Sequence, residues 1–131
     1  MLMEENFRKK TAHDVARLMM AAARTAPKGR GRDSLFIALA SDDEMQQIAK
    51  TMKIFAEEWE TQFFARDARN LLHSDALVLI GTKIEPLDLR KCGFCGFENC
   101  SEKNLHPNTP CAYNNIDLGI AVGSAVAVAA Q

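Results

Sequence analysis

The sequence has 131 residues, a formal net charge of -1, 47% hydrophobic residues and 25% charged residues. This size and composition are typical of one globular domain whose core needs no disulfides, and the near-zero charge gives no general attraction to nucleic acid. The charged first ten residues lack the apolar segment of an export signal, and the apolar stretch 116–130 is too short to span a bilayer. We therefore expect a single cytoplasmic domain over residues 1–131 that binds neither nucleic acid nor a membrane.

Apolar residues at helical spacing predict a first helix over residues 4–24, and the short apolar run 35–40 predicts a buried strand. Ser41 and Glu44 have the spacing of a capping box, so a second helix is expected to begin there. This helix either continues without a break or stops near Thr61 and restarts. Its apolar stripe is expected to pack in the core. The stripe consists of Met45, Ile48, Met52, Phe55 and Trp59.

A second buried strand is expected over residues 75–81. Its apolar run does not alternate with polar residues, which favours a sheet covered on both faces. The segment 82–112 is expected to be irregular. A last helix is expected to begin near Asn114, with Asp117 in its first turn, where a negative charge interacts favourably with the helix dipole.

The apolar C-terminal helix is expected to need a covering partner. Residues 121–130 are apolar on nearly every side, and a helix of that kind must be buried. Gly119 and Gly123 form a small-residue surface that lets another helix approach closely. The sequence also stops at Gln131 without a cap or a return strand. We therefore expect either a homodimer or a chain that is truncated at its C-terminus.

All four cysteines lie within 20 residues, in the pattern Cys-x2-Cys-x4-Cys-x10-Cys. They are Cys92, Cys95, Cys100 and Cys111. A reducing cytosol argues against disulfides. Four thiolates at one place repel each other and need a cation to neutralise them. The pattern therefore predicts one metal site, which holds either an iron–sulfur cluster or a tetrahedral zinc ion.

The spacing favours the iron–sulfur cluster. One compact loop supplies three ligands and Cys111 supplies the fourth, whereas structural zinc sites more often use two Cys-x2-Cys pairs. The compactness of the three near cysteines favours [4Fe–4S] over [2Fe–2S]. Gly93 and Gly96 permit a tight wrap that brings backbone N–H groups near the sulfurs. Phe94 and Phe97 are expected to exclude water. Zinc stays the alternative.

A basic turn forms a second candidate site. Arg24, Lys28, Arg30 and Arg32 precede Asp33 around two glycines. Such a turn can bind a phosphate group, and the plainer interpretation is a solvated basic turn. The glycine spacing of the Walker and dinucleotide-binding motifs is missing.

Several segments, in order, resemble the ferredoxin-domain proteins of bacteria and archaea, a family defined as a domain of unknown function. These segments are Ala23–Gly31, Arg66–Ala68, Ser74–Gly81, Cys92–Phe97 and Asp117–Ala125. The resemblance covers nearly the whole chain. It implies a cluster at the four cysteines and does not indicate a reaction.

Two regions that overlap these segments are also similar to nitroreductases, which are flavin-binding α+β homodimers. They are Ala22-Ala23-Arg24 with Ala26-Pro27 before a strand, and the helix Asp117–Ala130. The resemblance implies helices packed on a small sheet, an FMN at a dimer interface, and Arg24 as a ligand of the flavin phosphate. Lys28 and Arg30 lie in the stretch where nitroreductases have Ser and Asn facing the flavin.

We therefore expect an α/β (α+β) fold of the nitroreductase kind, with an irregular cysteine-rich loop before the last helix. The first functional hypothesis is a ferredoxin-like iron–sulfur protein that passes single electrons to a redox partner, or an oxidoreductase component. The second is a non-enzymatic zinc module for protein interaction. The sequence contains no nucleophile, metalloprotease or paired-carboxylate signature that would indicate a substrate.

Overall fold

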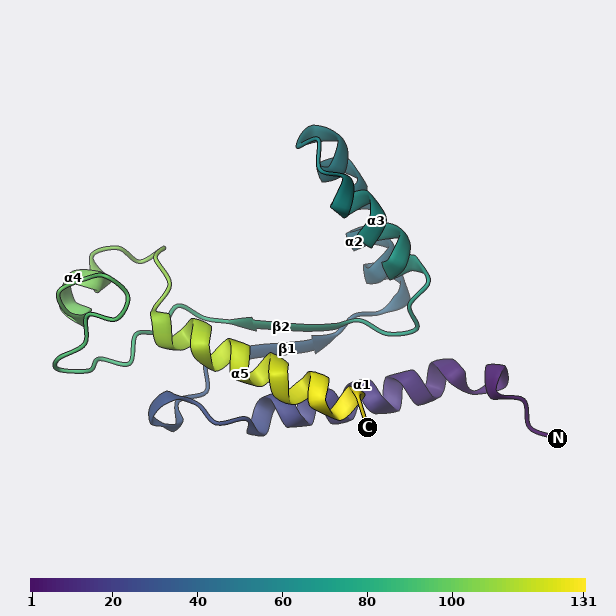
Figure 1. Ribbon diagram of the computed structural model, residues 1–131, viewed down its shortest axis with the longest axis horizontal. Coiled ribbons are helices and arrows are strands. Elements are labelled where there is room, and N and C mark those ends of the chain that lie inside the picture. The colour runs from purple at the N-terminus through teal and green to yellow at the C-terminus, as the bar shows by residue number, and fades with distance from the viewer. The chain divides into compact units, whose positions relative to one another are not determined.

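The computed structural model describes residues 1–131 and mixes helices with strands, as expected (Figure 1). Its five α-helices accompany one sheet of two strands. The chain divides into two compact units, residues 1–17 with 39–78 and residues 18–38 with 79–131. Each unit has its own cluster of buried apolar residues. None of the helices combines the length and the apolar character needed to cross a bilayer.

The unit of residues 1–17 and 39–78 contains the first half of α1 (Arg8–Thr25), α2 (Asp42–Glu58) and α3 (Gln62–Leu72). The expected capping box begins α2: the Glu44 N–H donates to Ser41 Oγ at 3.3 Å, and the Ser41 N–H donates to Glu44 Oε2 at 2.7 Å. The helix breaks before Thr61, where Glu60 has a φ of 52°. The alternative of a break and restart is therefore correct.

Only one end of the apolar stripe of α2 lies in the core. Met45 is 5% exposed and joins a cluster with Ala40, Ala49, Ala68 and Leu71. At the other end Trp59 is 57% exposed and stacks on Phe55, with 4.5 Å between the ring centroids. The expectation that the whole stripe packs in the core is wrong at Trp59, because this residue follows the end of the helix.

The sheet pairs β1 (Leu35–Leu39) with β2 (Val78–Thr82) in antiparallel register. Ser34 O accepts the Lys83 N–H at 3.0 Å, and the hydroxyls of Ser34 and Thr82 are 2.8 Å apart. Leu35 is 7% exposed while its neighbour Phe36 is 60% exposed. The expectation of a sheet covered on both faces is therefore wrong, because successive side chains point to opposite faces and only one face is packed.

The unit of residues 18–38 and 79–131 packs that covered face on α5 (Ala112–Ala129) and the end of α1. Its buried cluster consists of Ala23, Ala26, Leu35, Ala121 and Ala125. Because four of these five side chains are methyl groups, the backbones of the elements approach closely and the core is thin. A short helix, α4 (Cys100–Asn104), lies inside the segment that we expected to be irregular.

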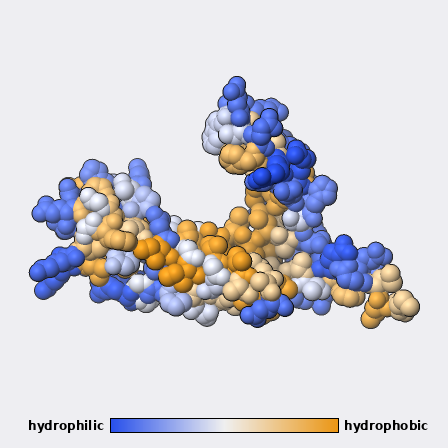
Figure 2. Space-filling model, viewed as in Figure 1, coloured by the Kyte–Doolittle hydropathy of each residue, from blue (hydrophilic) through white to orange (hydrophobic).

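The single chain leaves much of α5 uncovered, as the hydrophobic surface along this helix shows (Figure 2). Ile116 is 42% exposed and Val126 is 56% exposed. A Cβ added at Gly119 or Gly123 would meet no atom within 4 Å. Asp117 is not in the first turn of this helix, since α5 begins at Ala112, and is instead 4% exposed.

Candidate metal centre in the cysteine loop

The four cysteines occupy different backbone settings within one unit. All are free thiols. Cys92 and Cys95 lie among turns and bends, and Cys100 is the first residue of α4. Cys111 is the N-cap residue of α5 and is 6% exposed, whereas the other three are half-buried. One cysteine is thus fixed to a long helix and three belong to the preceding loop.

Cys92 directly precedes a tight turn, and Cys95 lies within it. The Gly96 N–H donates to Gly93 O at 2.9 Å, and Gly96 has a φ of 90°. A Cβ at Gly93 would lie 3.0 Å from Phe97 O, so the backbone folds back closely at this point. The expected use of both glycines for a tight wrap agrees with this geometry.

The two phenylalanines of this turn differ in their surroundings. Phe97 stacks on His106, with 5.0 Å between ring centroids, and Phe94 lies 5.9 Å from the ring of Tyr113. Phe94 is nevertheless 67% exposed. The expectation that the two rings exclude water from a cluster stays a prediction.

A buried amide joins the two ends of the loop. Asn114 is 2% exposed, its Oδ1 accepts the Glu85 N–H at 3.0 Å, and its Nδ2 donates to Glu85 O at 3.0 Å. These two hydrogen bonds hold the segment that follows β2 against the first turn of α5. Asn114 lies in that turn, three residues after Cys111. Arg30 adds a contact by donating to Leu87 O at 2.7 Å. Sequence reasoning missed Asn114, because its partner is a backbone group 29 residues away.

The cysteines are not gathered as metal ligands in this conformation. No three side chains among His, Cys, Asp and Glu form a set that could hold a metal ion. The donor chemistry nevertheless fits a cluster or zinc, since four free thiols share one segment. The tetrathiolate site at Cys92, Cys95, Cys100 and Cys111 therefore stays a prediction, and its formation requires the loop to close.

A buried cation lies in the same loop. Lys103 of α4 is 2% exposed, and it is the one basic residue among the buried side chains of the chain. Its backbone N–H donates to Asn99 O at 3.1 Å, in the first turn of the helix. A buried cation of this kind is stabilised by a negatively charged group close to it.

The N–H groups of the basic turn donate hydrogen bonds to other groups of the protein. Both carboxylate oxygens of Asp117 accept the Gly29 N–H at 3.0 Å. Arg24 donates to Asp33 at 2.7 Å, and this hydrogen bond lowers the pKa of the Asp33 carboxyl. Lys28 donates to three backbone carbonyls at the end of α1. A phosphate would compete with these acceptors, so Arg24 as a flavin-phosphate ligand stays a prediction that these contacts do not favour.

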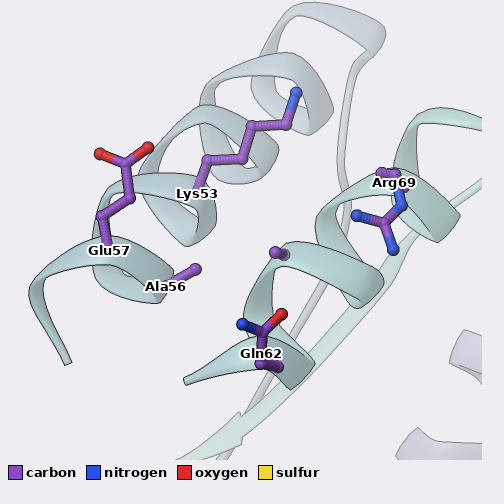
Figure 3. A pocket seen from close by; sticks show the side chains of 6 residues that line it. Lys53, Ala56, Glu57, Gln62 and Arg69 are labelled. Atoms are coloured by element: carbon purple, nitrogen blue, oxygen red, sulfur yellow. The ribbon is translucent and has the colours of Figure 1, made fainter. Parts of the chain in front are cut away.

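Two grooves lie outside the cysteine loop. One groove of about 370 Å³ lies between α2 and α3 and is lined by Lys53 and Glu57 of α2 and by Gln62 and Arg69 of α3 (Figure 3). The charges that line it are of both signs. A second groove, of about 490 Å³, is apolar and is lined by side chains that include Trp59. Neither contains a cysteine or a histidine.

Comparison with known proteins gives one clear relationship. No family model matches the chain, and no solved structure matches it. An uncharacterised protein of Archaeoglobus fulgidus is 40% identical over 140 aligned residues, which cover 100% of this chain and 74% of the archaeal one. Identity at this level over the whole chain shows common descent and a common fold. The chain therefore belongs to the same family as this archaeal protein.

Proposed function

We propose that this chain is an iron–sulfur protein, ferredoxin-like in its chemistry, that transfers electrons or serves as the redox component of an oxidoreductase. The observation that carries the proposal is the set of four free cysteines in the pattern Cys-x2-Cys-x4-Cys-x10-Cys. They are the only cysteines of the chain, and all four belong to one compact unit. The favoured cofactor is a [4Fe–4S] cluster.

The division of the cysteines between helix and loop supports this proposal. Cys111 sits at the N-cap of α5, and Asn114 fixes that end of the helix against Glu85. The other three cysteines belong to a segment of turns, bends and one short helix. A metal centre would draw these three toward Cys111, and its binding free energy would then stabilise the closed loop.

When bound, a [4Fe–4S] cluster supplies one-electron transfer. The chain would supply the four thiolates, and the backbone N–H groups around Gly93 and Gly96 would tune the potential by hydrogen bonding. The stacked pair of Phe97 and His106 would cover one side of the loop.

Anaerobic purification followed by iron, sulfide and zinc analysis tests this proposal. We expect a brown protein with about four irons and four sulfides per chain, whose broad visible absorbance bleaches with dithionite. Cys111→Ser should lower the iron content and the absorbance, whereas Ser101→Ala, an exposed change in the same loop, should leave both unchanged. A colourless, metal-free protein after anaerobic reconstitution would refute the proposal.

The second candidate is a non-enzymatic zinc module for protein interaction. The four free thiols of one segment support it as well, since they are also the donor set of a structural zinc site. Stoichiometric zinc without iron or sulfide, retained through anaerobic purification, would decide for this candidate and against electron transfer. In that case zinc would only pin the loop.

We also propose that the protein is cytoplasmic and that two copies of the chain form a homodimer with a nitroreductase-like arrangement. The argument for the homodimer comes from α5. The exposed face of α5, with open space at Gly119 and Gly123, supports it. Light scattering should give twice the chain mass, and Val126→Glu should give a monomer. A flavin belongs to the same proposal: a yellow supernatant after denaturation would show FMN, and a monomeric wild type would contradict the dimer.

A further inference from the structure

Lys103 differs from the other buried polar residues in having no partner for its side chain. Asn114 and Asp117 are buried and hydrogen-bonded to backbone groups. The Lys103 side chain takes part in no hydrogen bond and no ion pair, although only 2% of the residue is exposed. Every fully shielded side-chain nitrogen and oxygen has a partner. The ammonium therefore touches solvent only at the small exposed part of this residue.

A buried ammonium without a counter-charge is unfavourable, because it loses hydration and gains no attraction in return. The acids near Lys103 do not supply that attraction. Between Leu89 and Ile116 the sequence contains only two acids, Glu98 and Glu102, and both are exposed. Glu102 already accepts the Glu98 N–H at 2.6 Å. The positive charge is thus unmatched within its own segment.

The helix that carries this charge also carries a cysteine. Cys100 and Lys103 both lie in α4, three positions apart. Side chains at i and i+3 of a helix share one face. The start of this helix is fixed by Asn99, whose Oδ1 accepts the Glu102 N–H at 3.0 Å. The lysine is therefore on the same side of α4 as one of the four predicted metal ligands.

We propose that Lys103 is the charge partner of the metal centre formed by the four cysteines, and that it acts as a positioning residue for that centre. Four thiolates outweigh the charge of a [4Fe–4S] core or of one zinc ion, so the complete centre is an anion. The ammonium would offset this charge and would supply an N–H donor for a sulfur of the centre. This inference rests on the proposed function, because it requires the metal centre to form.

Two consequences separate this role from simple burial of a long side chain. In the metal-free protein Lys103→Met removes an unmatched charge and keeps the apolar stem, so its stability should equal or exceed that of the wild type. In the metal-bound protein the same change removes a favourable charge. The reduced cluster carries one more negative charge than the oxidised cluster, so loss of Lys103 should lower the reduction potential.

The test uses the full chain, prepared anaerobically, in four forms: wild type, Lys103→Met, Lys103→Arg and Lys91→Met. Lys91 is exposed in the same loop, so its variant makes the same charge change at the surface. We expect Lys103→Met to shift the one-electron reduction equilibrium at least tenfold, about 59 mV, toward the oxidised form. Lys103→Arg should retain most of the wild-type potential, and Lys91→Met should shift it much less.

If the metal is zinc, release to a chelator replaces the potential as the readout. Lys103→Met should then release zinc at least tenfold faster than Lys91→Met. Equal potentials or equal release rates for the two variants, in protein that does contain metal, would overturn the role of Lys103 alone. Protein that binds neither iron nor zinc would overturn the proposed function and this inference together.

Discussion

Replacing Asn114 by Ala should open the base of the cysteine loop. The change removes two hydrogen bonds of 3.0 Å between a side chain that is 2% exposed and the backbone of Glu85. Each such bond contributes about 1 kcal/mol net, and a buried group left without a partner costs about 1–3 kcal/mol. Glu85 is exposed, so water can hydrogen-bond to its backbone groups once the amide is gone and reduce this cost. We therefore expect the free energy of unfolding to fall by about 2–3 kcal/mol in total. For a chain of this size that corresponds to a fall of roughly 10 °C in Tm.

Far-UV circular dichroism during urea unfolding measures this loss, and hydrogen exchange at the Glu85 amide locates it. The single tryptophan, Trp59, belongs to the other compact unit, so its fluorescence reports unfolding elsewhere in the chain. Asn115→Ala is the matched control, because Asn115 is the exposed neighbour in the same helix. If Asn114→Ala were as stable as this control and the Glu85 amide stayed protected, the reasoning about the loop base would be wrong.

Gly96→Ala should destabilise the chain by about 1–2 kcal/mol in thermal unfolding, because a residue with a Cβ disfavours a φ of 90°; no loss would show that the turn relaxes freely. Gly119→Ala should raise the free energy of unfolding of a monomer by about 1 kcal/mol, since the added methyl group enters open space in a helix. If the same change instead raises the dissociation constant of a dimer, the dimer interface lies at Gly119. The Arg24 contact lowers the pKa of Asp33, so the stability it adds should be present above the usual value of 3.8 and be lost as the pH falls through the lowered value. Urea titrations of the wild type and Asp33→Asn at several pH values measure this difference, which should be below about 1 kcal/mol because both side chains are partly exposed; a difference that persists at the lowest pH would contradict this reading. Ser41→Ala should cost about 1 kcal/mol by removing the cap of α2, and an unchanged urea midpoint would show that Glu44 caps the helix alone.

Local signals predicted the helices of this chain well. The capping box of Ser41 and Glu44 begins α2 as expected, and the break near Thr61 was one of the two stated alternatives. These features depend on residues three or four positions apart, whose geometry is set by the helix itself. The tight turn at Gly96 was predictable for the same reason, since glycine readily adopts a positive φ.

The sequence did not predict the burial and the hydrogen bonds that depend on residues far apart in the chain. The apolar run 75–81 suggested a sheet covered on both faces, and the run 35–40 suggested a buried strand, yet Phe36 is 60% exposed. Asp117 was expected to interact with the dipole of its own helix, but its carboxylate accepts the Gly29 N–H, 88 residues away in sequence. By residue type Lys103 does not differ from the other lysines of the chain. Its spacing of three from Cys100 was the only signal available before its burial was known.

By itself the sequence determined every α-helix except α4, both strands and the four residues that can serve as thiolate ligands, because secondary structure and ligand chemistry depend on residue type and on short spacing. Only the tertiary structure decided that Asn114 joins the ends of the loop, that Asp117 holds the Gly29 turn and that Lys103 is buried without a counter-charge. Burial and hydrogen bonding of this kind depend on which distant groups meet when the chain packs. No local sequence pattern predicts which distant groups come into contact.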